Sequence, residues 1–239
     1  MLELCQIKKY YGKKKVLDGI QMQFAHKIYG LLGINGAGKT TLMQIITGLL
    51  LQDEGMVLYH GKDIRKKDSG YFQQLGYMPQ QVGLYPDFTA EEFLHYICVL
   101  KKIPKKERWE RILMLLERVH LLKERKNKIG TFSGGMKQRL GIAQAMLNEP
   151  EILILDEATA GLDPLERIRF RELIESFRKD RTIIFATHII QDVETIADEL
   201  ILLDQGTILA KNSPAGFLQE IKSGNLEDIF LFYKCASDR

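Results

Sequence analysis

The stretch GINGAGKTT, residues 33–41, lies between an apolar segment, IYGLL at 28–32, and a helix-like segment, LMQIITGLL at 42–50. Two of its glycines, separated by four residues, are followed at once by lysine and threonine, which is the spacing of a phosphate-binding loop. In such a loop the backbone N–H groups turn inward around the anion, and glycine allows the curvature that this requires. The stretch therefore predicts a buried strand, an anion-binding loop and a helix, in that order.

Two side chains of this loop suit a nucleoside triphosphate and its metal ion. Lys39 can reach the β- and γ-phosphates, and the Thr40 hydroxyl can ligate Mg²⁺. The helix that begins near Lys39 adds unpaired N–H groups and the positive end of its dipole. The loop alone is compatible with a kinase, a GTPase, a helicase or a transporter subunit, and also with a turn that binds nothing. Segments farther along the chain distinguish these classes.

A pair of carboxylates follows the next buried strand. In the segment EILILDEATAGLDP, residues 151–164, a short apolar run ends in Asp156 and Glu157. A continuous apolar run is typical of a parallel strand that is buried on both faces, and such sheets bind ligands at the carboxyl ends of their strands. Asp156 suits the Mg²⁺ shell, and Glu157 is placed to polarise an attacking water. The alternative is that the two acidic residues only open a loop.

One histidine also follows an apolar, β-branched run. The segment TIIFATH, residues 182–188, ends at His188, which could present its imidazole to a γ-phosphate at the same sheet edge. The other histidines stand in ordinary polar or helical surroundings, which favours structural or exposed roles; they are His26, His60, His95 and His120.

A second helix start with the character of an anion site lies in TFSGGMKQRLGIAQAMLNEP, residues 131–150. Ser133, Gly134 and Gly135 precede apolar residues that recur at helical intervals, which predicts a helix that begins at the serine. Here the chain strongly resembles the nucleotide-binding subunits of ABC transporters. It matches their signature motif except at Phe132, where leucine is commonest. The resemblance extends over almost the whole chain.

The resemblance implies ATP and Mg²⁺ as cofactors, and it assigns family roles residue by residue. Tyr11 matches the aromatic side chain that stacks on adenine, with Val16 packing nearby, and Gln80 matches the glutamine that joins the Mg²⁺ and water shell and senses the transport partner. The catalytic residues that it implies are Glu157, His188, Gln80 and Lys39. The metal site that it implies comprises Thr40, Gln80 and Asp156. The nucleotide contacts that it implies are Tyr11, Val16, Asn35, Gly36, Ala37, Gly38, Lys39, Thr40, Thr41, Ser133, Gly134 and Gly135.

Two positions depart from the common family pattern. Ala158 follows the predicted catalytic glutamate where proline is usual, which leaves the backbone freer and restores an N–H donor. Ile34 stands where many relatives have proline, but the anion does not need that side chain. Because both carboxylates are intact, we expect hydrolysis to be retained.

The expected architecture is α/β: a P-loop NTPase core, RecA-like as the resemblance implies, with an antiparallel β edge layer and an inserted α-helical lobe. Between about residues 83 and 148 strand patterns give way to amphipathic helical ones, so we expect core segments 1–82 and 149–222, a lobe at 83–148 that carries the signature, and a tail at 223–239. The expected strands are 1–7, 19–24, 28–32, 75–78, 152–155, 182–186, 199–203 and 207–211.

The composition is that of a soluble domain with a sizeable core. The chain has 239 residues, of which 45% are hydrophobic, and a net charge of only +3. Since no apolar run is long enough to cross a bilayer and no signal peptide stands out, we expect a cytoplasmic protein. Because the net charge is small, we expect no nucleic-acid partner. The resemblance then implies a separate transmembrane permease, a place on the inner face of the membrane, and head-to-tail pairing with a second copy or a related ATPase.

The function expected is that of an ATPase subunit that powers a transporter. The tail GNLEDIFLFYK, from Gly224, resembles the C-terminal end of the exporter-type branch of this family. Together with the segment LYPDFTAEE, residues 84–92, this resemblance favours an exporter. A soluble ABC-type ATPase without a permease, such as an assembly scaffold, remains an alternative. A GTP switch is excluded, because the only Asn-Lys pair, Asn127-Lys128, lacks the aspartate of an Asn-Lys-x-Asp base reader.

Overall fold

The computed structural model describes residues 1–221 and 225–237. The expected boundary between the core, ending at residue 222, and the tail, beginning at residue 223, lies outside the described residues, as does Gly224. The helices are α1 (Lys39–Ile46), α2 (Ala90–Leu100), α3 (Lys105–Arg118), α4 (Gly134–Met146), α5 (Pro164–Ser176), α6 (Pro214–Ile221) and α7 (Ile229–Ser237). The strands are β1 (Leu2–Tyr11), β2 (Lys14–Phe24), β3 (Ile28–Leu32), β4 (Glu54–Tyr59), β5 (Lys62–Asp63), β6 (Leu75–Met78), β7 (Ile152–Asp156), β8 (Thr182–Thr187), β9 (Glu199–Asp204) and β10 (Thr207–Asn212).

The larger sheet is mixed and has the order β10-β9-β3-β8-β7-β6. Its pairs from β9 to β6 are parallel, and β10 adds an antiparallel edge. Every residue of β3, β7 and β8 is buried. This burial explains the continuous apolar runs, since helices or the second sheet cover both faces of these strands. The parallel core that the sequence predicts is confirmed.

The smaller sheet is antiparallel, with the order β2-β1-β4-β5. It confirms the predicted edge layer, but β4 and β5 were missed. The first three residues of β4 are exposed, so its sequence lacks the alternation of a half-buried strand. Its position comes from pairing with β1, in which Leu4 stands opposite Val57. Helix α1 packs between the two sheets, and their facing side chains form one of the two hydrophobic clusters.

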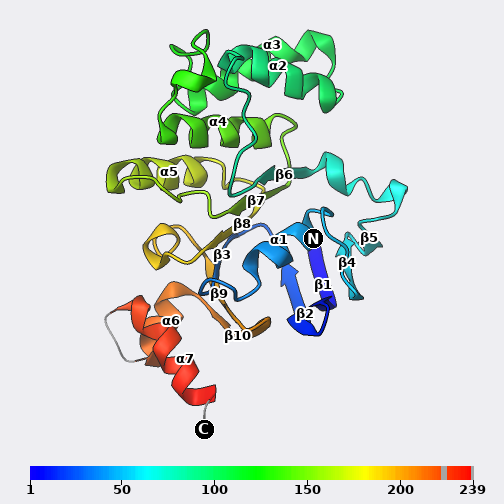
Figure 1. Cartoon of the computed structure of the whole chain (residues 1–239), viewed down its shortest axis with the longest axis vertical. Coiled ribbons are helices and arrows are strands. Elements are labelled where there is room, and N and C mark those ends of the chain that lie inside the picture. Colours follow the sequence, from blue (N-terminus) through cyan, green and yellow to red (C-terminus); the bar gives the residue numbers. More distant parts are fainter. Residues whose placement is uncertain (222–224, 238–239) are drawn as a thin grey trace.

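The helices α2, α3 and α4 form a lobe beside the β6 edge of the larger sheet, at the top of Figure 1. Thr89 and Glu92 form a capping box that begins α2, because each side chain accepts a hydrogen bond from the other's backbone N–H. The buried side chains of the lobe belong to the same hydrophobic cluster as one face of the larger sheet. The lobe is therefore packed onto the core as part of one continuous interior.

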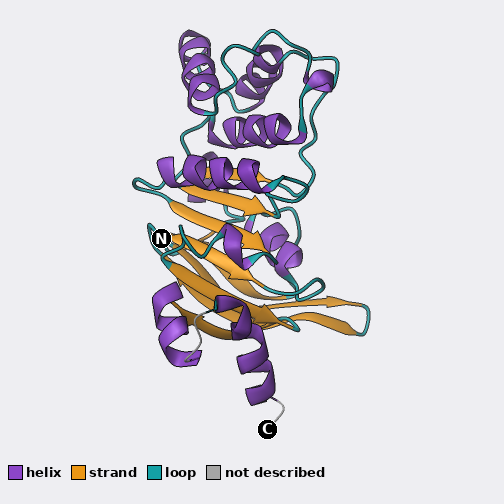
Figure 2. Ribbon diagram, turned by 90° about the vertical axis from the view of Figure 1, so that its left-hand side faces the viewer, coloured by secondary structure: helices purple, strands orange, loops and turns teal. Residues whose placement is uncertain are grey.

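Seen at right angles, the helices of the lobe lie above the stacked strands of both sheets (Figure 2). Among the described residues, no helix combines the length and the apolar character that a membrane span needs. The parallel strands β3, β6, β7 and β8 all end on one side of the sheet. The loops that follow these strands carry most of the residues that the sequence singled out.

Candidate functional site

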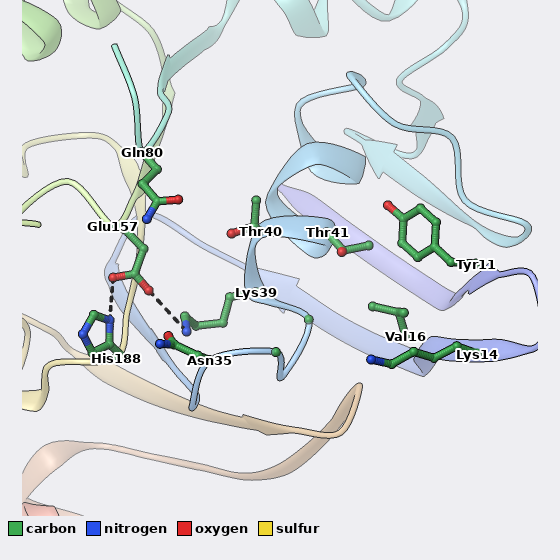
Figure 3. A pocket seen from close by; sticks show the side chains of 12 residues that line it. Tyr11, Lys14, Val16, Asn35, Lys39, Thr40, Thr41, Gln80, Glu157 and His188 are labelled. Carbon is green, nitrogen blue, oxygen red and sulfur yellow. Dashed lines mark hydrogen bonds and ion pairs between the residues drawn. The ribbon is translucent and has the colours of Figure 1, made fainter.

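A cavity of about 410 Å³ lies where these loops meet, which is within the range of small-molecule sites. One end holds the phosphate-binding loop with Glu157 and His188, and the other end holds an aromatic side chain (Figure 3). The lining residues are Tyr11, Lys14, Val16, Asn35, Gly36, Gly38, Lys39, Thr40, Thr41, Gln80, Glu157 and His188. All but Lys14 were predicted as site residues, so the fold brings together side chains from five separate segments.

The loop before α1 has the backbone that its glycines predict. Gly38 has φ 107°, in the left-handed region, and a Cβ there would lie 3.0 Å from the carbonyl oxygen of Val16. Gly38 is also the N-cap of α1, so no side chain accepts a hydrogen bond from the first N–H groups of that helix. A helix start without a side-chain cap leaves those donors free for an anion.

Lys39 is buried, with 5% of its surface exposed, and its ammonium is held by oxygen atoms. Its Nζ donates to the Gly33 carbonyl at 2.7 Å and lies 3.3 Å from Oε1 of Glu157. A buried ammonium needs such partners, because desolvation of an unpaired charge is costly. A bound phosphate can replace these oxygen atoms as the partner of the lysine.

Glu157 is 6% exposed and has φ 49°, which is uncommon for a residue other than glycine. Its Oε2 lies 2.8 Å from Nδ1 of His188, and dashed lines in Figure 3 mark this contact and the one to Lys39. Two oxygen atoms of one carboxylate are therefore held by two different side chains. A carboxylate fixed in this way can accept a proton from a water molecule at a defined place.

Asp156 is 1% exposed, and burial raises the pKa of its carboxyl to about 6. The Thr40 hydroxyl donates to its Oδ1 at 3.5 Å, and no hydrogen-bond partner for its Oδ2 exists among the described residues. An orphaned carboxylate oxygen beside a hydroxyl is a set of hard oxygen donors, which Mg²⁺ prefers. The residues present thus fit the metal that the resemblance implies.

The far end of the cavity is formed by the hairpin of β1 and β2. Tyr11 is 51% exposed there, which suits a ring that is covered by a ligand, and Val16 lies beside it. Lys14 also lines the cavity, although sequence reasoning missed it. Its position follows from the hairpin, in which Tyr11 and Lys14 stand opposite each other. The lysine run after the tyrosine was the available signal, but a turn of two residues had to be recognised to use it.

Four predicted nucleotide contacts do not line this cavity. Ala37 is buried and accepts a backbone hydrogen bond from Gly206 at 3.0 Å, so it supports the loop from behind. Ser133, Gly134 and Gly135 lie at the start of α4 in the lobe, whereas α1 lies between the sheets (Figure 1). The Ser133 hydroxyl accepts a hydrogen bond from Met136 N at 3.2 Å and so caps its own helix.

Comparison with known proteins finds one family repeatedly. The family model described as ABC transporter matches residues 17–160. The linearmycin resistance ATP-binding protein LnrL of Bacillus subtilis (strain 168) is 38% identical over 212 residues, 88% of this chain and 68% of that protein. The lantibiotic transport ATP-binding protein SrtF of Streptococcus pyogenes is 36% identical over 232 residues, 96% of each. A solved structure titled "Structure of ATP binding subunit of ABC transporter" has a TM-score of 0.86 and 27% identity, and the match covers 98% of this chain and 99% of that one.

Proposed function

This chain belongs to the ABC transporter family as an ATP-binding, ATP-hydrolysing subunit, and from this premise we propose that it powers an exporter through head-to-tail pairing of two copies. The observation that carries the proposal is the convergence of Lys39, Glu157 and His188 on one cavity that also holds the phosphate-binding loop. Each of these side chains suits one part of phosphoryl transfer to water.

The roles follow from the contacts. We assign Glu157 as the base that accepts a proton from the attacking water, with His188 holding the carboxylate at 2.8 Å and facing the γ-phosphate. Lys39 exchanges its contact with Glu157 for the β- and γ-phosphates when ATP enters, which frees a carboxylate oxygen for the water. Gln80 lines the same cavity and would orient this water together with Glu157 and His188.

The metal site is assigned to Asp156, Thr40 and Gln80. Bound Mg²⁺ would neutralise charge on the phosphate oxygens during transfer. The Thr40 hydroxyl and the free oxygen of Asp156 would supply its ligands from this chain, and Gln80 would join through the water shell.

The other half of each site is proposed to come from a second copy. Because Ser133, Gly134 and Gly135 do not line the cavity of their own chain, their helix start is available to the γ-phosphate of a partner's ATP. ATP then closes the pair, and loss of the γ-phosphate contacts lets it reopen. We propose the same division as before: a core, a lobe at 83–148 that presents the signature, and a tail.

A separate transmembrane permease is the partner that would use this motion. A groove beside the Gln80 loop is a place where it could dock, since three exposed aromatic side chains next to it form a cluster, with tilted or edge-to-face rings whose centroids lie 5.3–6.1 Å apart. These aromatic residues are Tyr85, Phe88 and Tyr96. Docking there would hold the chain on the inner face of the membrane, and the relative named for linearmycin resistance supports outward transport.

Replacement of Glu157 by glutamine tests the proposal. Glu157→Gln keeps the shape of the side chain but removes the base, so hydrolysis should fall at least ~10²-fold while Mg-ATP still binds. The variant should accumulate as an ATP-bound dimer, which light scattering with and without ATP would detect. Glu149→Gln is the matched control, because this exposed carboxylate lies away from the cavity. Normal turnover by Glu157→Gln, or a monomer in ATP, would contradict the proposal.

A further inference from the structure

We propose that Thr159 and Asp192 form a positioning pair that holds the loop of Glu157 against the loop of His188. The inference rests on the proposed roles of those two residues in hydrolysis. Neither member of the pair lines the nucleotide cavity. They act by fixing where the carboxylate and the imidazole stand relative to each other.

The pair joins the two loops directly. Thr159 follows the glutamate by two residues and is 1% exposed, and Asp192 follows the histidine by four residues and is 0% exposed. The Thr159 hydroxyl donates a hydrogen bond to Oδ2 of Asp192. This bond is the side-chain link between the two loops that lies deepest in the protein, behind the exposed edge where His188 meets Glu157.

Helix α5 supports the link from a third side. Arg167 Nη1 lies 3.7 Å from Oδ1 of Asp192, and the same guanidinium donates from Nε to the Leu162 carbonyl at 3.2 Å. One turn later, Arg171 donates to the Gln191 carbonyl. Two arginines of one helix therefore reach the histidine loop, and one of them also holds the loop that precedes α5.

Burial of the Asp192 carboxylate lowers the stability of the fold. Its Oδ1 has no hydrogen-bond partner among the described residues, and Arg167 is beyond hydrogen-bond distance from it. A buried carboxylate with incomplete partners costs stability that an apolar side chain of similar size would avoid. A requirement for precise loop placement explains why a polar pair occupies this position. We infer that the buried pair lowers stability but keeps the carboxylate of Glu157 and the imidazole of His188 in place.

The placement matters because the proposed chemistry depends on a 2.8 Å contact between the ends of two loops. If the pair is broken, the loops can separate, and displacement of a catalytic group by about 1 Å can lower turnover ~10²-fold. The phosphate-binding loop, Tyr11 and Val16 are not attached to the pair. Turnover should therefore fall while nucleotide affinity is unchanged.

Thr159→Val is the direct test, because valine has the shape of threonine without the hydroxyl. We expect kcat to fall about 10- to 100-fold, with the affinity for Mg-ATP and the KM within about twofold of the wild type. Thr159→Ser restores the hydroxyl and should recover most of the lost kcat. Thr182→Val is the matched control: Thr182 is also 1% exposed, and its hydroxyl donates to the Ala25 carbonyl away from the cavity.

A double variant separates positioning from stability. Thr159→Val with Asp192→Asn removes the buried charge as well as the link, so its Tm should recover relative to Thr159→Val, while kcat stays low. Recovery of kcat together with Tm in the double variant would overturn the inference. Equal losses of kcat in Thr159→Val and Thr182→Val would also overturn it, as would failure of both of these single variants to fold. If Glu157→Gln retains full turnover, the proposed function fails instead; if it is inactive and Thr159→Val is fully active, only this inference fails.

Discussion

The starts of α1 and α4 are both glycine-containing helix N-termini, but they differ in how they are capped and in what surrounds them. At α1 the N-cap is Gly38, no side chain caps the helix, and the first residue, Lys39, is buried beside a cavity. At α4 the N-cap is Ser133, whose own hydroxyl satisfies Met136 N, and Gly134 is exposed. The first N–H groups of α1 are therefore available to a ligand in the chain's own cavity. The start of α4 already has a side-chain cap, and it is exposed at the surface.

The difference fits the proposed pairing, in which one chain carries two half-sites that do not meet within it. A serine oxygen that accepts from Met136 N can still donate its own proton to an incoming phosphate oxygen. The start of α4 also has little room to change, because a Cβ on Gly135 would overlap the carboxylate of Glu166 on α5. The α4 start thus has little freedom to move, as the proposed pairing requires of a helix start that donates to a ligand held by another copy.

Damage to the α4 start alone should have the largest effect. Ser133→Arg places a bulky cation where the partner's phosphate would arrive, so steady-state turnover should fall at least ~10²-fold, the scale for loss of transition-state contacts. Affinity of the monomer for ATP, measured by fluorescence titration, should stay within about twofold, because the α1 half is intact. Ser133→Thr keeps the hydroxyl and is the control. A parallel loss of ATP affinity would show that α4 belongs to the same cavity as α1.

Substitution at the end of the cavity where adenine is predicted to bind should have an intermediate effect, which is on nucleotide affinity. The resemblance implies that adenine stacks on Tyr11, so Tyr11→Ala should weaken ATP and GTP alike by about tenfold, the scale of one base–aromatic stack. The same titration in Tyr11→Phe, which keeps the ring, should match the wild type. Strict selectivity for ATP that survives Tyr11→Ala would show that another group reads the base.

The smallest effect expected is that of pH on the affinity for Mg-ATP, through protonation of Asp156. Burial raises the pKa of Asp156 to about 6 from its ordinary 3.8, so the carboxyl gains a proton as the pH falls through about 6 and then no longer offers Mg²⁺ an anion. From about pH 7.5 to about pH 5.5, affinity for Mg-ATP should fall about fourfold more in the wild type than in Asp156→Asn. Calorimetric titration at the two pH values measures the difference. Equal pH dependence in both proteins would remove Asp156 from the metal site.

The two helix starts also show what sequence can predict. Short-range patterns were sufficient for the strand, loop and helix around residues 28–46 and for the α4 start, because spacing within one segment carries the chemistry. Continuous apolar runs located β3, β7 and β8 for the same reason. The catalytic assignments of Glu157 and His188 remain predictions, although the fold brings the two side chains into contact.

What escaped prediction depends on contacts between distant segments. Strand β4 exists because β1 pairs with it, and its own sequence has little alternation. Lys14 enters the cavity because a hairpin places it opposite Tyr11. The hydrogen bond from Thr159 to Asp192 joins two loops from different strands, and neither residue belongs to a motif that periodicity or composition reveals. Such features follow from packing, which local patterns do not specify.

In the proposed pairing, each complete site takes its α1 start from one copy and its α4 start from the other. Mixing Ser133→Arg with Lys39→Ala, two variants that are inactive alone, tests it most directly. A mixed dimer has one site with both lesions and one site with neither, so random pairing should restore about a quarter of the wild-type ATPase activity. No recovery in a sample shown by mass to contain mixed dimers would contradict the claim, and so would full-rate hydrolysis by Ser133→Arg as a monomer.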